Sequence, residues 1–237
     1  MATIISTPSD IAVIFDLDGT LVDSVYQHVE AWHEAMLQCG IVLPLWKIHR
    51  KIGMSGGLVA EGLAREIHRS VDASLTSRLL DIHAREYLAR LNRVAPTEGA
   101  NELLGELTRS GVPWAIATSS DYKTACSTLS RLTTQVPVLV TRDEVKRGKP
   151  YPDLFIKAAA QLNYALSHCI VIGDASWDHL AAQRGCAFSV GVLSGGYGTS
   201  ELREAGALRV YADPADILDH LDELALGRAE PADNVVS

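Results

Sequence analysis

An uninterrupted apolar run near the start of the chain, residues 11–15, predicts a β-strand that is buried on both faces. The run leads directly into Asp16-Leu17-Asp18-Gly19-Thr20, which places two carboxylates one residue apart on a tight turn. Open α/β sheets carry their chemistry at this end of the strands. Because two acids beside an apolar strand repel each other and lose hydration, we expect a positive group between them, specifically a divalent metal ion.

The pattern changes after Thr20 to apolar residues at helical spacing, which predicts a block of helices that reaches to about Asn92. Helices are expected around residues 22–37, 58–67 and 75–88. Strand-like segments resume only after Pro96. The helical block is therefore predicted to be a domain inserted after the first strand.

From Pro96 onward, strands and helices alternate in the order typical of a parallel sheet. Strands are predicted at residues 114–117, 136–140, 169–172, 188–192 and 208–211, and helices at 98–110, 121–131, 153–162, 177–184 and 215–226. The predicted fold class is α/β: a doubly wound, Rossmann-like parallel sheet with an inserted all-helical cap. We assign residues 1–22 and 94–237 to the α/β core domain and residues 23–93 to the cap domain.

Composition and charge favour a protein that binds a small molecule. Of the 237 residues, 47% are apolar, which is enough for a sizeable core. The net charge of −8 argues against a nucleic-acid surface, and the chain has no polybasic stretch for binding a membrane. The four cysteines are widely spaced, as expected for reduced thiols, and no targeting segment is found. We therefore expect a cytoplasmic protein, either a monomer or a weak homodimer.

The polar residues that follow the predicted strands form one candidate site. Because the carboxyl ends of parallel strands meet at the same edge of a sheet, we expect these side chains to converge. They are Asp16, Asp18, Thr118, Lys149, Asp174 and Asp178. One cation among so many acids requires a hard cation with oxygen ligands, and Mg²⁺ is the usual choice where a phosphate is also bound. A phosphate would then bridge the metal, Lys149 and the Thr118 hydroxyl.

Four motifs resemble those of the haloacid dehalogenase superfamily, in the phosphoglycolate phosphatase and β-phosphoglucomutase branch with a helical cap. The motifs are residues 16–24 (DLDGTLVDS), 117–119 (ATS), 148–153 (GKPYPD) and 173–178 (GDASWD). Taken singly, Asp18 suits a turn, and Thr118 and Asp174 suit helix caps. Together, the four motifs match the family in order and spacing over nearly the whole chain.

The resemblance implies a role for each of these residues. Asp16 would be the nucleophile that forms an aspartyl-phosphate, and Asp18 would protonate the leaving alkoxide and then activate water. Thr118, Ser119 and Lys149 would hold the phosphate oxygens. Mg²⁺ would be held by the Asp16 carboxylate, the Asp18 main-chain carbonyl and Asp174, with Asp178 bound directly or through water.

Substrate choice is expected to depend on the cap, whose one glycine-rich basic loop is residues 50–57. Arg50 or Lys51 would meet a second anionic group of the substrate, and Gly53 would allow close backbone approach. The alternative, that Arg50 and Lys51 form a solvated face of the cap, stays open.

The predicted function is Mg²⁺-dependent hydrolysis of a small phosphorylated metabolite, of the phosphoglycolate or sugar-phosphate type. A phosphomutase similar to β-phosphoglucomutase would keep all four motifs and is the main alternative. Related dehalogenases lack the second acid, and related phosphonate hydrolases have a small residue there, so Asp18 argues against both. A non-catalytic phosphate-binding module would need a missing nucleophile or lysine, and neither is missing.

Three other features are expected to serve structure rather than chemistry. The eight histidines form no metal-binding pair and are predicted to be surface or packed residues. Trp32 and Trp46 are predicted to pack inside the cap, and Trp114 against the sheet. The glycine-rich residues 194–198 are predicted to form a flexible connection near the rim of the site.

Overall fold

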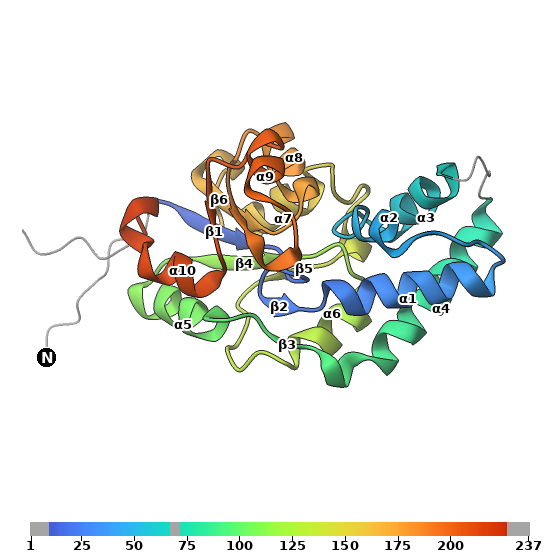
Figure 1. Cartoon of the computed structure of the whole chain (residues 1–237). Helices are drawn as coiled ribbons and strands as arrows, with labels where there is room; N and C mark the ends of the chain where they lie inside the picture. The colour runs from blue at the N-terminus through green and yellow to red at the C-terminus, as the bar shows by residue number, and fades with distance from the viewer. Residues whose placement is uncertain (1–9, 67–71, 227–237) are drawn as a thin grey trace, which may run out of the picture.

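A computed structural model describes residues 10–66 and 72–226 and shows an α/β core with a helical cap at one end (Figure 1). The core is a six-stranded parallel sheet in the order β5-β4-β1-β6-β7-β8. Its strands are β1 (Ala12–Phe15), β4 (Trp114–Ala117), β5 (Leu139–Val140), β6 (Cys169–Gly173), β7 (Phe188–Val192) and β8 (Arg209–Tyr211). This arrangement confirms the predicted fold class.

Strand β1 lies at the centre of the sheet, as its apolar sequence predicts. It pairs with β4 on one side, where Phe15 is opposite Ile116, and with β6 on the other, where Phe15 is opposite Ile172. All four residues of β1 are fully buried. Because side chains alternate along a strand, Phe15 and Ile14 point into different helix layers, and both faces of the strand need apolar residues.

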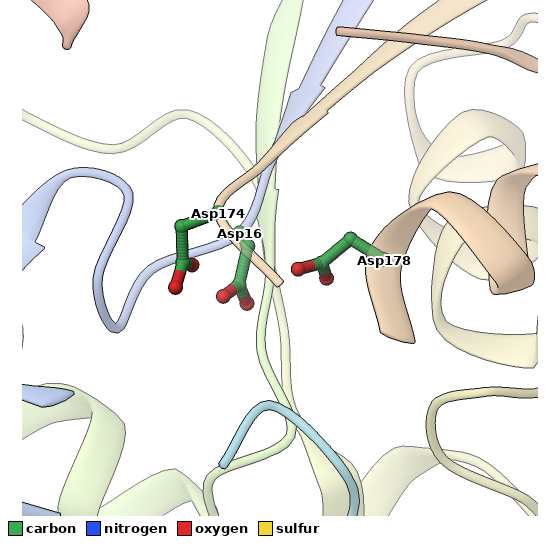
Figure 2. Close-up of side chains that lie close together, drawn as sticks. All are labelled: Asp16, Asp174 and Asp178. Atoms are coloured by element: carbon green, nitrogen blue, oxygen red, sulfur yellow. The ribbon is translucent and has the colours of Figure 1, made fainter. Parts of the chain in front are cut away.

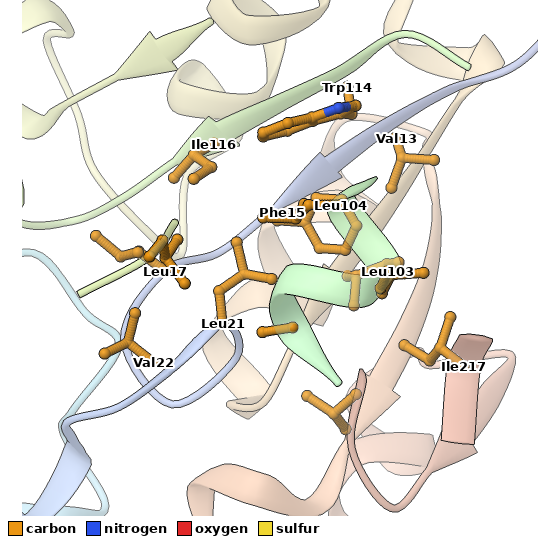
Figure 3. Packing of buried hydrophobic residues seen from close by; sticks show 14 of the residues in the cluster. Val13, Phe15, Leu17, Leu21, Val22, Leu103, Leu104, Trp114, Ile116 and Ile217 are labelled. Carbon is orange, nitrogen blue, oxygen red and sulfur yellow. The ribbon is translucent and has the colours of Figure 1, made fainter. Parts of the chain in front are cut away.

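Helices cover both faces of the sheet. Helices α5 (Ala100–Ser110) and α10 (Pro214–Asp219) pack on the face that carries Phe15 and Trp114, as Figure 3 shows for Leu103, Leu104 and Ile217. Helices α7 (Asp153–Gln161) and α8 (Ser176–Arg184) pack on the opposite face, in the cluster that contains Ile14. The core also contains α6 (Tyr122–Leu129) and α9 (Thr199–Glu204).

The cap is formed by the helices that follow β1 in the chain. They are α1 (Val25–Gln38), α2 (Leu45–His49), α3 (Gly56–Arg65) and α4 (Ala73–Ala89). These helices enclose an apolar cluster of their own, which includes Val29, Trp32, Leu63 and Leu79. The chain enters and leaves the cap through the short antiparallel pair β2 (Val22–Asp23) and β3 (Ala95–Pro96). We propose the domain boundaries at this pair, as the sequence suggested.

Some local predictions were wrong. Val22 pairs with Pro96 in β2, so the first helix begins only at Val25. Strand β5 is shorter than residues 136–140, because Pro137 has no N–H to donate to a neighbouring strand. Trp46 is 64% exposed, since Ile48 is the apolar residue that the short helix α2 buries.

Trp32 and Trp114 are buried as predicted. The predicted helix at 215–226 is α10 followed by a 3₁₀ turn over Leu221–Leu224. No helix within residues 10–66 and 72–226 combines the length and apolar character needed to cross a bilayer.

Candidate active site

Strands β1 and β6 are parallel neighbours, and their carboxyl ends lie side by side at the point where the strand order of the sheet reverses. The chain proceeds from β1 to β4 and β5 on one side, and from β6 to β7 and β8 on the other. A crevice at such a switch point is where α/β sheets bind their ligands. Asp16 directly follows β1 and Asp174 directly follows β6, so both carboxylates are delivered to this crevice.

Three carboxylates converge at this point (Figure 2). One oxygen atom from each of Asp16, Asp174 and Asp178 lies within 4.8 Å of the others, and all three residues are buried. Asp178 comes from the first turn of α8. Two glycines leave room for Asp174, because a Cβ atom on Gly19 or Gly195 would lie 2.4 or 1.7 Å from its Oδ2 atom. Residues 194–198, predicted as a connection near the rim, thus include a residue that packs directly against the site.

Lys149 brings a buried ammonium group to these acids. It forms an ion pair with Asp16, and its Nζ atom lies 2.8 Å from Oδ1 of Asp178. Burial alone would lower the pKa of Lys149, but Asp16 and Asp178 outweigh this effect and raise it, so the lysine stays charged. Burial raises the pKa of Asp16 to about 7 although Lys149 acts in the opposite direction. Burial and the neighbouring acids raise the pKa of Asp174 well above its usual value.

This donor set fits a hard divalent cation. A single ammonium faces three buried carboxylates, and their excess negative charge adds to burial in raising the pKa values of Asp16 and Asp174. Carboxylate oxygens are the ligands that Mg²⁺ prefers in proteins. Asp16, Asp174 and Asp178 are therefore the residues placed to hold such an ion.

Asp18 lies on the same loop as Asp16, but its carboxylate has different partners. Ser24 and Ser120 donate hydrogen bonds to it at 2.7 and 3.0 Å, and the Nε2 atom of His28 lies 3.1 Å from its Oδ1 atom. Burial would raise the pKa of Asp18, but these partners, led by His28, lower it to about 2. Two carboxylates on one loop thus have pKa values shifted in opposite directions, which suits them to different chemical roles.

His28 is a site residue that the sequence did not predict, since the histidines were expected only on the surface or in packing. Its Nδ1 atom lies 3.0 Å from Nε2 of His83 on α4, and its ring stacks on Tyr87 with centroids 3.8 Å apart. One signal was available in the sequence. Ser24 and His28 are four residues apart at the start of the helix that follows the acidic loop, so they share one face.

The loop after β4 faces Asp18 from the core. Thr118 Oγ1 lies 3.4 Å from Asp18 Oδ2, and Thr118 accepts a hydrogen bond from the Ser120 N–H at 3.1 Å. Ser119, predicted to bind substrate, donates instead to the Gly53 carbonyl of the cap at 3.0 Å. Thr118, Ser119 and Ser120 all line a cavity between the core and the cap.

A cavity of about 540 Å³ lies between core and cap, above Asp16 and Asp18. This volume is in the range of pockets that enclose small molecules. The core side of its wall consists of Thr118, Ser119, Ser120, Asp121, Thr124, Arg142 and Asp143. The cap side consists of residues from α1, the loop after α2, α3 and α4, including His28, Trp32, Gly53, Val59, Leu80 and His83.

In the predicted basic loop of the cap, residues 50–57, some residues line the cavity and others point to the surface. Gly53 lines the cavity with a φ of 90°, a conformation that favours glycine. Arg50 forms an ion pair with Glu201 at 2.8 Å and lies over the ring of Tyr197. Lys51 Nζ lies 3.9 Å from a Glu66 oxygen. Neither Arg50 nor Lys51 lines the cavity, so the structure does not bring these two cations to the other site residues.

Comparisons with known proteins agree with this geometry. The sequence profile of the haloacid dehalogenase-like hydrolases matches residues 12–185. The chain is 34% identical to hexitol phosphatase A of Escherichia coli K12 over 165 residues, which are 68% of this chain and 73% of that protein. It is 32% identical to validoxylamine A 7′-phosphate phosphatase of Streptomyces hygroscopicus subsp. limoneus over 184 residues, which are 76% of this chain and 84% of that protein.

A solved structure is similar over almost the whole chain. The crystal structure of a hydrolase from Pseudomonas syringae superposes with a TM-score of 0.88 at 50% sequence identity. The match covers 90% of this chain and 99% of that chain. The similarity therefore includes both the sheet and the cap helices.

Proposed function

The chain belongs to the haloacid dehalogenase-like hydrolases, in the branch of the phosphoglycolate phosphatases and β-phosphoglucomutases, and we propose that Asp16 is its nucleophile. It is a phosphatase of small phosphorylated metabolites. The observation that carries the proposal is the arrangement of two acids under one cavity. Asp16 is in contact with Lys149, whereas Asp18 is held by His28, Ser24 and Ser120.

Asp16 would attack the phosphorus atom of the substrate. One of its carboxylate oxygens forms the new P–O bond while the bond from phosphorus to the leaving oxygen breaks. A carboxylate reacts poorly with an anionic phosphate unless positive charge offsets their repulsion, and Lys149 is placed to contribute that charge. When bound by Asp16, Asp174 and Asp178, Mg²⁺ would supply further positive charge between nucleophile and phosphate.

Asp18 would transfer the protons of both half-reactions. It would give a proton to the leaving oxygen and later take one from the water that attacks the aspartyl-phosphate. With a pKa of about 2, Asp18 is a carboxylate at neutral pH. The negative phosphate arriving beside it would raise this pKa and allow Asp18 to hold a proton in the complex.

We propose water, rather than a sugar hydroxyl, as the final acceptor of the phosphoryl group. Hexitol phosphatase A and validoxylamine A 7′-phosphate phosphatase, which are 34% and 32% identical to this chain, are phosphatases by name. The phosphomutase reaction is the alternative, because it would use the same Asp16, Asp18 and Lys149.

The test is phosphate release by the purified protein with Mg²⁺ and a panel of phosphomonoesters that includes p-nitrophenyl phosphate. We expect inorganic phosphate from the wild type and at least about a thousandfold less from Asp16→Asn. Asp222→Asn, at an exposed position in the 3₁₀ turn after α10, is the matched control. Full activity in Asp16→Asn would remove Asp16 as the nucleophile, and transfer between sugar positions without phosphate release would favour the mutase.

A further inference from the structure

We infer that the cavity selects an uncharged, hydroxyl-bearing leaving group, such as a polyol or sugar, over one that carries a second phosphate or a carboxylate. The inference rests on the proposed phosphatase function and concerns the part of the same cavity beyond Asp16 and Asp18. The leaving group would occupy this part, between the cap helices and the start of α6.

Positive charge is scarce on this part of the wall. Within residues 10–66 and 72–226, Arg142 is the only lysine or arginine that lines the cavity. Its guanidinium group donates to the main-chain carbonyls of Val145 and Lys146 at 2.7 and 3.3 Å, which fix the direction of the side chain but leave its charge. His83 adds no charge, because burial lowers its pKa well below the usual value for histidine. Among these residues a second anion would meet one charged side chain of lysine or arginine, which is held toward the main chain, and His28, whose Nε2 atom already faces Asp18.

Negative charge is present instead. Asp81 on α4 and Asp121 and Asp143 on the core all line the cavity. Asp121 accepts hydrogen bonds from Thr124, and Asp143 accepts one from the Tyr122 N–H, so both remain acceptors held in place. Carboxylates accept hydrogen bonds from hydroxyl groups, but they repel a phosphate or carboxylate at short range.

The remaining wall is flat and apolar. Trp32 stacks on His83 with ring centroids 4.4 Å apart and planes 22° from parallel, and both residues line the cavity. Ile52, Val59 and Leu80 extend this surface. Such a wall matches the C–H face of a sugar ring or polyol chain, while the carboxylates that line the same cavity can accept hydrogen bonds from its hydroxyl groups.

The two cap cations that the sequence suggests for binding a second anion do not line the cavity. Arg50 is held by Glu201 and Tyr197, and Lys51 lies near Glu66. The cavity that contains Asp16 and Asp18 therefore has the charge and shape of a site for a monoanionic or dianionic phosphate on an otherwise neutral molecule.

The test compares two substrates that differ at one carbon. Glucitol 6-phosphate and 6-phosphogluconate have the same chain length and the same phosphate, but the first ends in CH₂OH and the second in a carboxylate. We expect kcat/KM to be at least about tenfold higher for glucitol 6-phosphate, as for a penalty of about 1.4 kcal/mol. Where neither is turned over, their inhibition constants against p-nitrophenyl phosphate hydrolysis should show the same order.

Substitution of Gly57 tests the cause of this preference. Gly57 lines the cavity, and a Cβ atom there would have no neighbour within 4 Å, so a side chain can start at this position without a clash. Gly57→Arg should reduce the preference for glucitol 6-phosphate severalfold, whereas the neutral Gly57→Gln should not. Gly105→Arg, an equally open position on α5, controls for the added net charge. Asp81→Asn should move the preference in the same direction as Gly57→Arg without any new bulk.

The outcomes separate this inference from the function on which it rests. Equal or better use of 6-phosphogluconate by a wild type that hydrolyses p-nitrophenyl phosphate would overturn the inference and leave the phosphatase intact. An unchanged preference in both Gly57→Arg and Asp81→Asn would also overturn it. Absence of phosphate release from all three compounds would overturn the proposed function, and the inference with it.

Discussion

The Nε2 atom of His28 lies 3.1 Å from the carboxylate of Asp18, although one residue belongs to the cap and the other to the core. The same histidine is fixed on its other side by His83 and Tyr87, which both come from α4. The position of the cap helices is therefore linked directly to the group that we propose as acid and base.

Replacing His28 by phenylalanine should slow catalysis while keeping the ring that stacks on Tyr87. The change removes the hydrogen bond to Asp18, and with it the main influence that lowers the pKa of this acid. We expect kcat to fall by about 10- to 100-fold for an alkyl phosphate, as for other residues that orient a reacting group. Steady-state kinetics at saturating Mg²⁺ measures this effect.

The leaving group provides the control for His28→Phe. p-Nitrophenolate leaves readily without a proton, so its release depends less on Asp18 than the release of an alkoxide. The loss should be clearly smaller with p-nitrophenyl phosphate than with an alkyl phosphate. An equal loss with both would mean that His28 acts on folding or closure rather than through Asp18.

Replacing Lys149 by methionine should destabilise the metal-free protein. The change leaves Asp16 and Asp178 buried without their ammonium partner, and breaking such a pair costs about 3–5 kcal/mol. Urea unfolding in EDTA measures the loss in the free energy of unfolding. Lys146→Met, an exposed position three residues earlier, should change stability little. Similar stabilities of the two variants would contradict the view that Lys149 compensates the buried charges of Asp16 and Asp178.

Mg²⁺ should stabilise the wild type against heat, and Asp174→Asn should abolish the effect. At a concentration 100 times the dissociation constant, a ligand adds about 2.7 kcal/mol to the free energy of unfolding. In EDTA the variant should melt at a higher temperature than the wild type, because it lacks one buried charge whose pKa is strongly raised. Asparagine keeps the Oδ1 acceptor for Thr20, which donates to Asp174 at 3.0 Å.

Thermal unfolding with and without Mg²⁺ checks both parts of this prediction. Asp222→Asn serves as the control and should keep the full response to Mg²⁺. A metal response that survives in Asp174→Asn would mean that the ion does not need this carboxylate.

Tyr197→Phe should weaken closure of the cap on the core. The Tyr197 hydroxyl donates to the Arg50 carbonyl at 3.1 Å, and a hydrogen bond of this kind is worth about 1 kcal/mol. We expect kcat/KM to fall by about fivefold and by the same factor for every substrate. Tyr151→Phe, on the surface of the core, is the control. A loss that depends on the leaving group would place Tyr197 in substrate selection instead.

The core of the fold and the acids of the site could be predicted because they depend on short stretches of sequence. The apolar run before Asp16 identifies the central strand, and the position of each acid after its strand follows from the geometry of a parallel sheet. Asp174 was identified because it follows a predicted strand, and Lys149 because it lies in a predicted turn before Pro150.

The parts that escaped prediction depend on contacts between distant segments. His28 meets His83 only because α1 and α4 pack side by side, and its four-residue spacing from Ser24 indicates a shared helix face without showing what that face contacts. For Arg50 and Lys51 the sequence left both a substrate contact and a solvated face of the cap open, because it does not show that Glu201 and Glu66 are their partners. Strand β2 has only two residues, which is too short for the alternation of apolar and polar residues that identifies a strand in a sequence.

Apart from the ion pair of Arg50 with Glu201, four contacts between the cap and the core are accepted by main-chain carbonyls. Trp177 and Tyr197 donate to that of Arg50, Ser119 to that of Gly53, and His49 reaches that of Gly195. A main-chain acceptor is present whatever side chain the position carries. Mutations at positions 50 and 51 can thus alter the surface of the cap, including the ion pair of Arg50 with Glu201, while these main-chain hydrogen bonds are kept. Evolution of new substrate preferences on this scaffold would not have to rebuild the closed state each time.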